Sequence, residues 1–305
     1  MQAAILTPVP EAVIFLADKV RERHGSSAVE AVVMYGSCLR SGNPYDGLVD
    51  FYVLVKDYTS AYDQRWLVLM NRLLPPNVFY YETTYQGRVI RSKYAVVSCD
   101  HFATGVQRWF HSYLWGRFAQ PCRLVYFQGQ ESVSWVADVL LQAAARMVAE
   151  TVPLLPDCFD WRSLWQTGLR YSYSAELRTE RAGQRAQELV DDAADHFRHL
   201  TPALVASLPY SCELVGDDQF CLRIPGRVRI RGRIAWSLRK IQGKGLSLVR
   251  LIKSLFTFQG GVDYILWKLE RHTGQRIDVP ARVRSHPLIY GWGILWKLYR
   301  QGIFR

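Results

Sequence analysis

The chain has 305 residues, 49% of them hydrophobic and 21% charged, with a formal net charge of +11. A chain of this length usually divides into more than one domain, and this composition excludes a disordered protein. No stretch offers the ~20 consecutive apolar residues of a membrane-spanning helix. The first residues also lack a basic leader, so we expect neither a spanning segment nor a signal peptide.

The first hundred residues alternate helical and strand-like patterns, which predicts an α/β (α+β) domain built on a mixed sheet. Gln86-Gly87, between two strand-like runs, is typical of a tight hairpin turn. The predicted elements are a helix over residues 11–23 and strands over residues 28–34, 48–55, 78–84 and 88–98.

Helical spacing of apolar residues dominates the middle of the chain. It predicts helices over residues 132–150, 161–171 and 181–200. A small hairpin is expected beyond them, with strands 220–224 and 228–230 around Pro225-Gly226. We place a domain boundary near residue 125, so the predicted divisions are 1–125, 126–230 and a basic C-terminal region over 231–305.

The positive charge is concentrated at one end. Residues 221–305 contain 18 Lys and Arg against three acidic residues, a net +15, whereas residues 1–220 contain 20 against 24, a net −4. A basic and aromatic region of this kind is expected to bind a polyanion, either a nucleic acid or an anionic membrane surface.

The six cysteines are scattered singly, with no C-x-x-C pair and no nearby histidine cluster. This spacing favours neither a zinc site nor a disulfide framework, so we predict reduced thiols that are mostly buried. The cysteines are Cys38, Cys99, Cys122, Cys158, Cys212 and Cys221.

A candidate phosphate site begins where the first predicted strand ends, at Tyr35-Gly36-Ser37. Gly36 lets the backbone approach a phosphate, and Ser37 offers a hydroxyl and an N–H at the start of a helix. Asp50, on the next strand, is suited to hold Mg²⁺ against a triphosphate. Taken alone, the pattern is equally well explained by a Gly-Ser turn and a solvated strand-edge aspartate.

Nucleotidyltransferases of the DNA-polymerase-β type usually carry a second carboxylate two residues after the first, where this chain has Tyr52. A tyrosine in place of the second carboxylate fits one branch of these nucleotidyltransferases. Tyr35-Gly36-Ser37 with Val49-Asp50-Phe51 resembles the mitochondrial-type phosphatidate cytidylyltransferase family. The resemblance continues through Lys93 to Ser98, through Trp109, Tyr113, Gly116-Arg117 and Pro121, through Leu155-Pro156 and Phe159, through Ser172 to Arg178, and at Phe256-Thr257 with residues 262–269.

The resemblance implies a nucleotidyltransferase domain followed by a winged-helix-like domain, with the nucleotide between them. It implies the Mg²⁺-dependent reaction of CTP with phosphatidic acid to give CDP-diacylglycerol and pyrophosphate. The catalytic residues it implies are Asp50, Ser37 and Lys93. Those implied for nucleotide and phosphate binding are Tyr35, Gly36, Ser37, Lys93, Tyr94, Arg117, Glu176 and Arg178, with Asp50 as the metal ligand and Glu82 and Glu176 as possible companions.

Each companion also has a simpler explanation. Glu176 stands where the family has Asp, one methylene shorter, and Glu82 fits a surface position on a strand. Asp46 could reach a metal from its loop but is also typical of a turn. His101 and His111 are expected to be ordinary surface or partly buried histidines.

The tail contains an amphipathic segment in which Leu248, Val249, Ile252, Leu255 and Phe256 share one helical face, with Arg250 and Lys253 off it. Aromatic residues mixed with Lys and Arg suit the headgroup region of an anionic bilayer. Trp292, Trp296 and Tyr299 continue this mixture. We therefore expect a cytoplasmic protein, peripheral on the inner face of the membrane, although the same pattern would fit a helix packed on the catalytic domain.

Two rival functions stay open. The first is nucleotide transfer to another acceptor, such as a different lipid phosphate or an RNA end. The second is a non-catalytic protein that binds nucleic acid through its basic tail, which the Tyr52 departure supports. The tail lacks the recurring exposed aromatic platforms of RNA-binding modules, so nucleic acid is the less favoured partner.

Overall fold

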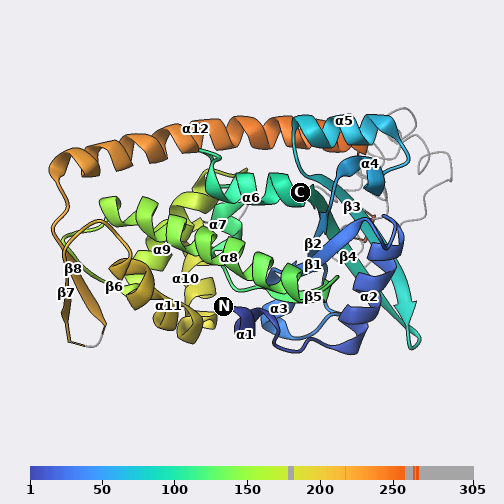
Figure 1. The fold of residues 1–305 in the computed structure, drawn as a ribbon, viewed down its shortest axis with the longest axis horizontal. Coiled ribbons are helices and arrows are strands. Elements are labelled where there is room, and N and C mark those ends of the chain that lie inside the picture. The colour runs from blue at the N-terminus through green and yellow to red at the C-terminus, as the bar shows by residue number, and fades with distance from the viewer. Residues whose placement is uncertain (178–181, 217, 258–263, 265, 268–305) are drawn as a thin grey trace, which may run out of the picture.

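The computed structural model describes residues 1–177, 182–216, 218–257, 264, 266 and 267. It is a mixed α/β fold around a five-stranded sheet in the order β3-β4-β2-β1-β5 (Figure 1). Neighbouring strands are antiparallel except β2 and β4, which are parallel. The strands are β1 (Val29–Tyr35), β2 (Val49–Val55), β3 (Asn77–Tyr85), β4 (Arg88–Ser98) and β5 (Arg123–Phe127).

The predicted N-terminal elements are confirmed to within two residues, and β5 is added at the sheet edge beside β1. The hairpin turn between β3 and β4 is the one predicted, because Gln86 and Gly87 both adopt positive φ, 48° and 75°. A strand running back against β1 was not predicted. Its five residues fall close to the expected domain boundary.

Helices cover both faces of this sheet. One face, where Val32, Phe51 and Val96 point, packs against α2 (Glu11–Glu22), α4 (Tyr58–Ala61) and α5 (Arg65–Leu73). The other face, where Val33 and Leu54 point, packs against α6 (Cys99–Gln107), α7 (Trp115–Phe118) and α8 (Gln130–Thr151). Two further short helices are α1 (Gln2–Ile5) and α3 (Ser37–Ser41).

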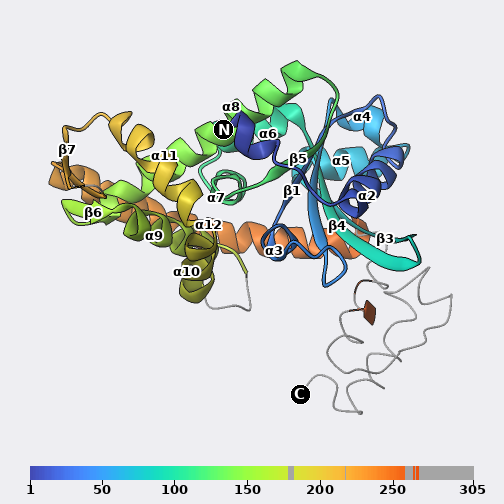
Figure 2. The same ribbon diagram turned by 90° about the horizontal axis from the view of Figure 1, so that it is seen from below.

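The remaining helices form a second region beside the sheet (Figures 1 and 2). Its members are η1 (Val152–Leu154), α9 (Trp161–Ser174), α10 (Ala182–Asp192), α11 (Ala194–Ala206) and a small sheet of β6 (Cys158–Asp160), β7 (Cys212–Val215) and β8 (Gln219–Leu222). One hydrophobic core runs from the second face of the large sheet through α8 into this region. The two regions therefore share a hydrophobic core.

Two sequence predictions in this region are wrong. The helix expected over residues 181–200 is two helices, because the chain breaks between α10 and α11 at Ala193, whose φ and ψ are −123° and 33°. Pro225-Gly226 is not a hairpin turn; residue 226 begins the helix α12 (Gly226–Thr257). A proline immediately before a helix is well tolerated there, and the hairpin lies earlier, between β7 and β8.

The long helix α12 runs past both regions along one edge of the molecule (Figure 1). Its 32 residues span about 48 Å. Trp236 and Arg239 fix its first half, by an indole N–H to the Glu150 carbonyl and an ion pair of 2.7 Å to the Glu150 carboxylate. None of the described helices is both long and apolar enough to cross a bilayer.

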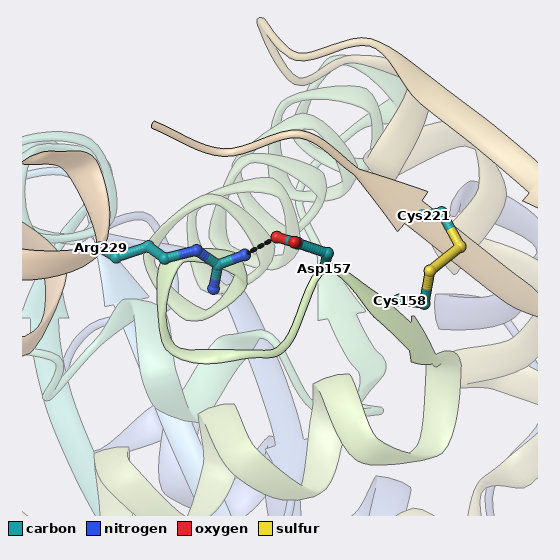
Figure 3. The surroundings of a disulfide bond; sticks show 4 residues. All are labelled: Asp157, Cys158, Cys221 and Arg229. Carbon is teal, nitrogen blue, oxygen red and sulfur yellow. Dashed lines mark hydrogen bonds and ion pairs between the residues drawn. A yellow bond between two sulfur atoms is a disulfide. The ribbon is translucent and has the colours of Figure 1, made fainter. Parts of the chain in front are cut away.

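Two of the cysteines form a disulfide, which corrects the prediction of six reduced thiols. Cys158 and Cys221 are directly opposite each other on the antiparallel strands β6 and β8, and their sulfurs are bonded (Figure 3). The ion pair of Asp157 with Arg229 lies beside them, at the start of α12. Sequence spacing could not show this pair, because the two cysteines are 63 residues apart.

Candidate active site

A cavity of about 840 Å³ lies between the large sheet and the helical region. Gly36 at the end of β1, Asp50 at the start of β2 and Lys93 in β4 line it from the sheet, which we call the sheet side. Arg117 of α7 and Glu176 after α9 line it from the helices, which we call the helix side. The residues that line the cavity range from Tyr35 to Trp267 along the chain.

Gly36 is required by the position of Asp50. Tyr35 pairs with Asp50 across the two strands, so the carboxylate lies against the next residue of β1. A Cβ built on Gly36 would lie 2.5 Å from an Asp50 carboxylate oxygen, and the φ of Gly36 is +89°, which side chains rarely adopt. The predicted glycine and aspartate are therefore one structural unit.

Ser37 follows as the first residue of α3, and it lines the same cavity. The helix has five residues, so its dipole is small, but the N–H groups of its first turn have no partner within the helix. Lys93 lies directly beside Asp50 in the parallel pair of β2 and β4. A cation and a carboxylate thus face the cavity from adjacent strands.

The helix side is organised around Arg117. Its guanidinium donates to the Tyr52 hydroxyl at 2.9 Å and to both Glu176 carboxylate oxygens at 3.2 and 3.3 Å. Both members of this ion pair are largely buried, with 14% of each side chain exposed. The guanidinium also lies 4.6 Å from the ring centroid of Tyr113.

These contacts shift the pKa values of the groups involved. Burial alone would lower the pKa of Arg117, but Tyr52, Glu176 and Tyr113 around it raise its pKa well above the usual value. Burial, and then the nearby charge of Asp50, raise the pKa of Tyr35. Burial also raises the pKa of Tyr52. The arginine therefore stays charged and both phenols stay neutral across the physiological range.

Tyr52 occupies the position where related nucleotidyltransferases carry their second carboxylate. Its side chain is fully buried and accepts the hydrogen bond from Arg117. This position therefore holds a hydrogen-bond partner of Arg117 and no carboxylate.

Two of the predicted site residues that the structure describes, Tyr94 and Glu82, lie outside the cavity. Tyr94 is 1% exposed on the opposite face of the sheet, where its hydroxyl contacts Arg23 and His24, so it is removed from the predicted nucleotide site. Adjacent residues of a strand point to opposite faces, and Lys93 faces the cavity. Glu82 pairs with Arg91 on the edge strand and does not line the cavity. Arg178 lies outside the described residues.

The cavity also contains residues that sequence reasoning missed or ranked low. Asp46 lines it from the loop before β2. Arg40 and Arg185 add positive charge, and Tyr173, Tyr264 and Trp267 add aromatic surface. Arg40 is paired with Asp192 at 3.0 Å and Arg185 with Glu188 at 3.6 Å. No sequence motif marks these residues, because they come from segments far apart in the chain, among them α3, α9 and α10, which only the tertiary fold brings together.

The donor set suits a magnesium ion that is bound mainly by a nucleotide. Within the described residues, no group of three His, Cys, Asp or Glu side chains could hold a metal ion. Mg²⁺ at triphosphate sites commonly uses one or two carboxylates, with phosphates and water completing its shell. Asp50 could supply one such carboxylate, since it lines the cavity beside Gly36 and Ser37.

The sequence matches the family described as "Phosphatidate cytidylyltransferase, mitochondrial" over residues 29–219, more than half of the chain. The chain belongs to this family. The matched segment includes Gly36, Asp50, Lys93, Arg117 and Glu176. It is therefore a member of a nucleotidyltransferase family, as the sequence motifs predicted.

Among proteins of curated function, none matches the sequence. Among solved structures, the chain is similar to a nucleotidyltransferase-like protein from Exiguobacterium sibiricum. The two share 10% identity with a TM-score of 0.28, over 95% of this chain and 92% of that one.

Proposed function

We propose that this protein is a phosphatidate cytidylyltransferase, which forms CDP-diacylglycerol and pyrophosphate from CTP and phosphatidic acid. The observation that carries the proposal is the family match over residues 29–219, which contains the sheet side and most of the helix side of the cavity. The cavity has the mixture of basic, acidic and aromatic residues that a nucleoside triphosphate needs.

In the proposed reaction, a phosphate oxygen of phosphatidic acid attacks the α-phosphorus of CTP. A P–O bond forms to the lipid phosphate, and the bond to the pyrophosphate breaks. No general base is needed, because a phosphate monoester is already anionic near neutral pH. The task of the protein is to align two anions and to offset their charge.

The residues divide this task. Ser37 and Lys93 orient the triphosphate beside β1 and β4, and Arg117 offers a buried positive charge on the opposite side. Asp50 would hold Mg²⁺ together with the substrate phosphates. When bound, Mg²⁺ supplies positive charge that stabilises the triphosphate and the leaving pyrophosphate. Glu176 keeps Arg117 in place and is a weaker candidate for the metal.

The substrate also requires access to a bilayer. Phosphatidic acid carries two acyl chains, and the charged cavity is suited to its headgroup rather than to these chains. We infer that the protein is peripheral on an anionic membrane surface and that its basic C-terminal region contributes to this contact. The net +15 of residues 221–305 favours anionic lipid.

The direct test is incubation of the purified protein with radiolabelled CTP, Mg²⁺ and phosphatidic acid. We expect a labelled lipid with the mobility of CDP-diacylglycerol and a matching release of pyrophosphate. Parallel reactions contain ATP, GTP or UTP in place of CTP. Absence of a labelled lipid from an enzyme that still binds CTP would reject the proposal.

The same assay separates the rivals. Other lipid phosphates and RNA ends are offered as acceptors, so a product on RNA alone would favour the second nucleotidyltransferase function. The non-catalytic alternative gains support from Tyr52, which replaces a carboxylate. It predicts RNA binding that falls steeply with salt and no release of pyrophosphate with any acceptor.

A further inference from the structure

The short helix α5 exposes an apolar face that the core does not use. Leu67, Val68 and Asn71 point into the protein and are buried. On the other side, Trp66 is 41% exposed, Leu69 52% and Leu73 69%. These three positions are spaced by three and four residues, so their side chains share one face.

The helix α12 has the same arrangement over a much greater length. Its inner side is held by buried contacts, whereas a row of exposed apolar residues follows its outer side with helical spacing. This row consists of Ile230, Ile234, Leu238, Ile241, Leu248, Ile252 and Phe256, each at least half exposed. Four residues of the apolar face predicted from sequence, Leu248, Val249, Ile252 and Phe256, are thus exposed.

Two basic residues of α12, Arg250 and Lys253, contact the rest of the protein. Arg250 donates to the Pro75 carbonyl, and the Lys253 ammonium donates to the carbonyls of Leu74 and Pro76 and to the Asn77 side chain. These acceptors lie between the end of α5 and the first residue of β3. The half-buried Arg250 and the buried Lys253 therefore fasten the second half of α12 beside α5.

The two helices consequently lie side by side along one edge of the molecule (Figures 1 and 2). Neither contains an acidic residue: α5 has two arginines, and α12 has nine Lys and Arg. The basic residues exposed on them are Arg65, Arg72, Arg227, Arg231, Arg233, Lys240 and Lys244. Amphipathic helices that lie in the headgroup region of a bilayer commonly combine exposed Trp and Leu with flanking Arg.

We propose that α5 and α12 together form one membrane-binding surface, which places the sheet and the helical region on the same anionic bilayer. The proposal rests on the proposed function for its choice of a lipid partner, and it adds α5, from within the nucleotidyltransferase sheet, to the basic C-terminal region. Charge complementarity argues for anionic lipid, because every charged residue of both helices is positive. Docking through two helices would hold the protein in one orientation on the bilayer, which contact through a single helix would leave free to roll about its axis.

The test measures the partition coefficient of the full chain between water and vesicles. The vesicles consist of phosphatidylcholine and phosphatidylglycerol, and bound protein is separated by sedimentation. Trp66→Ser, Leu69→Ser and Leu73→Ser in one variant are expected to lower the partition coefficient roughly 10- to 100-fold, because three apolar groups lose their burial in lipid. Arg65→Gln with Arg72→Gln is expected to lower it roughly tenfold at low salt and less at high salt. Ile14→Ser is the matched control, since Ile14 is 43% exposed on α2.

Circular dichroism and the melting temperature establish that the variants fold. If the triple variant of α5 binds vesicles as tightly as wild type, the proposal is overturned. This result is also the one expected if residues 258–305 or a second copy of the chain covers the surface. If the triple variant instead loses binding to RNA while vesicle binding is unchanged, the surface belongs to a nucleic acid.

A second readout separates this inference from the proposed function. Activity is measured on a short-chain phosphatidic acid dissolved in water and on long-chain phosphatidic acid in vesicles. The α5 variants are expected to keep wild-type turnover with the dissolved substrate and to lose about tenfold or more with vesicles. No turnover with either substrate by the wild-type protein would reject the proposed function, whereas vesicle binding would still test the surface.

Discussion

The two sides of the cavity hold their charged groups in different ways. On the sheet side, Asp50 and Lys93 are adjacent through strand pairing, and the backbone sets their positions. On the helix side, Arg117 and Arg185 are positioned by carboxylates, Glu176 and Glu188, through side-chain contacts. A backbone-fixed group can be replaced without exposing a new charge, whereas removal of one member of a buried ion pair leaves the other uncompensated.

Because of this difference, we expect substitutions on the two sides to affect activity and folding stability differently. Substitutions on the sheet side should lower activity and leave the fold intact. Substitutions in the Arg117 network should lower both, because the network also joins α7 to the segment after α9.

The largest effect is expected for Asp50→Asn. We expect turnover to fall by about 10³-fold or more, because the substitution removes the carboxylate that would hold Mg²⁺. The melting temperature should change little, since the amide has the same shape. Asp46→Asn, in the same cavity, serves as the comparison and should have a smaller effect. Equal losses from the two variants would remove Asp50 from its assigned role.

Arg117→Met tests the helix side. We expect the free energy of unfolding to fall by about 3–5 kcal/mol, because Glu176 and Tyr52 lose their partner in a largely buried site. Denaturant titration measures this loss. Combining Arg117→Met with Glu176→Gln should recover part of it, since the uncompensated carboxylate is removed. Additive losses would mean that the ion pair does not couple the two residues.

Gly36→Ala tests whether the glycine and Asp50 form one unit. Because the new Cβ would meet the carboxylate at 2.5 Å, we expect turnover to fall about 100-fold, within the range seen for displaced catalytic groups. Gly42→Ala is the matched control. Gly42 also has a positive φ, 67°, but nothing lies within 4 Å of its Cβ position. The control should lose stability of about 1 kcal/mol and little activity.

The smallest effect concerns the pH dependence of stability. It involves His111, which lies near Glu176 of the helix side. Burial, and then the charges of Arg250 and Arg146, lower the pKa of His111 to about 4. The unfolded chain takes up this proton near pH 6.5, so the folded state loses stability as pH falls from about 6.5 to about 4. This contribution is at most about 3 kcal/mol at pH 4 and absent above pH 7. His111→Phe should flatten the stability curve over this range, and an unchanged slope would assign the loss to other groups.

Local patterns were sufficient for much of the fold and for the sheet side of the cavity. Strand alternation, the Gln86-Gly87 turn and the Gly-Ser before Asp50 are each determined within a few residues by backbone geometry. The exclusion of Tyr94 from the cavity could also have been read from this alternation, because its neighbour Lys93 faces the cavity.

Which residues form the helix side of the cavity depends on the tertiary structure. Residues from α7, α10 and the segment after α9 converge there only because one core joins the sheet to the helical region. The pairing of Cys158 with Cys221 likewise depends on strands far apart in sequence.

By itself, the sequence singled out Gly36 and Asp50, because one follows the first predicted strand and the other lies near the start of the next. The strand register that brings the two residues into contact came from the tertiary structure. The sequence also indicated the apolar face of residues 248–256 and the basic charge of residues 221–305, because these follow from helical spacing and composition. Only the tertiary structure decided which side faces outward. The carbonyls between α5 and β3 accept hydrogen bonds from Lys253 and Arg250, so the opposite side of the second half of α12, with its apolar residues, lies at the surface.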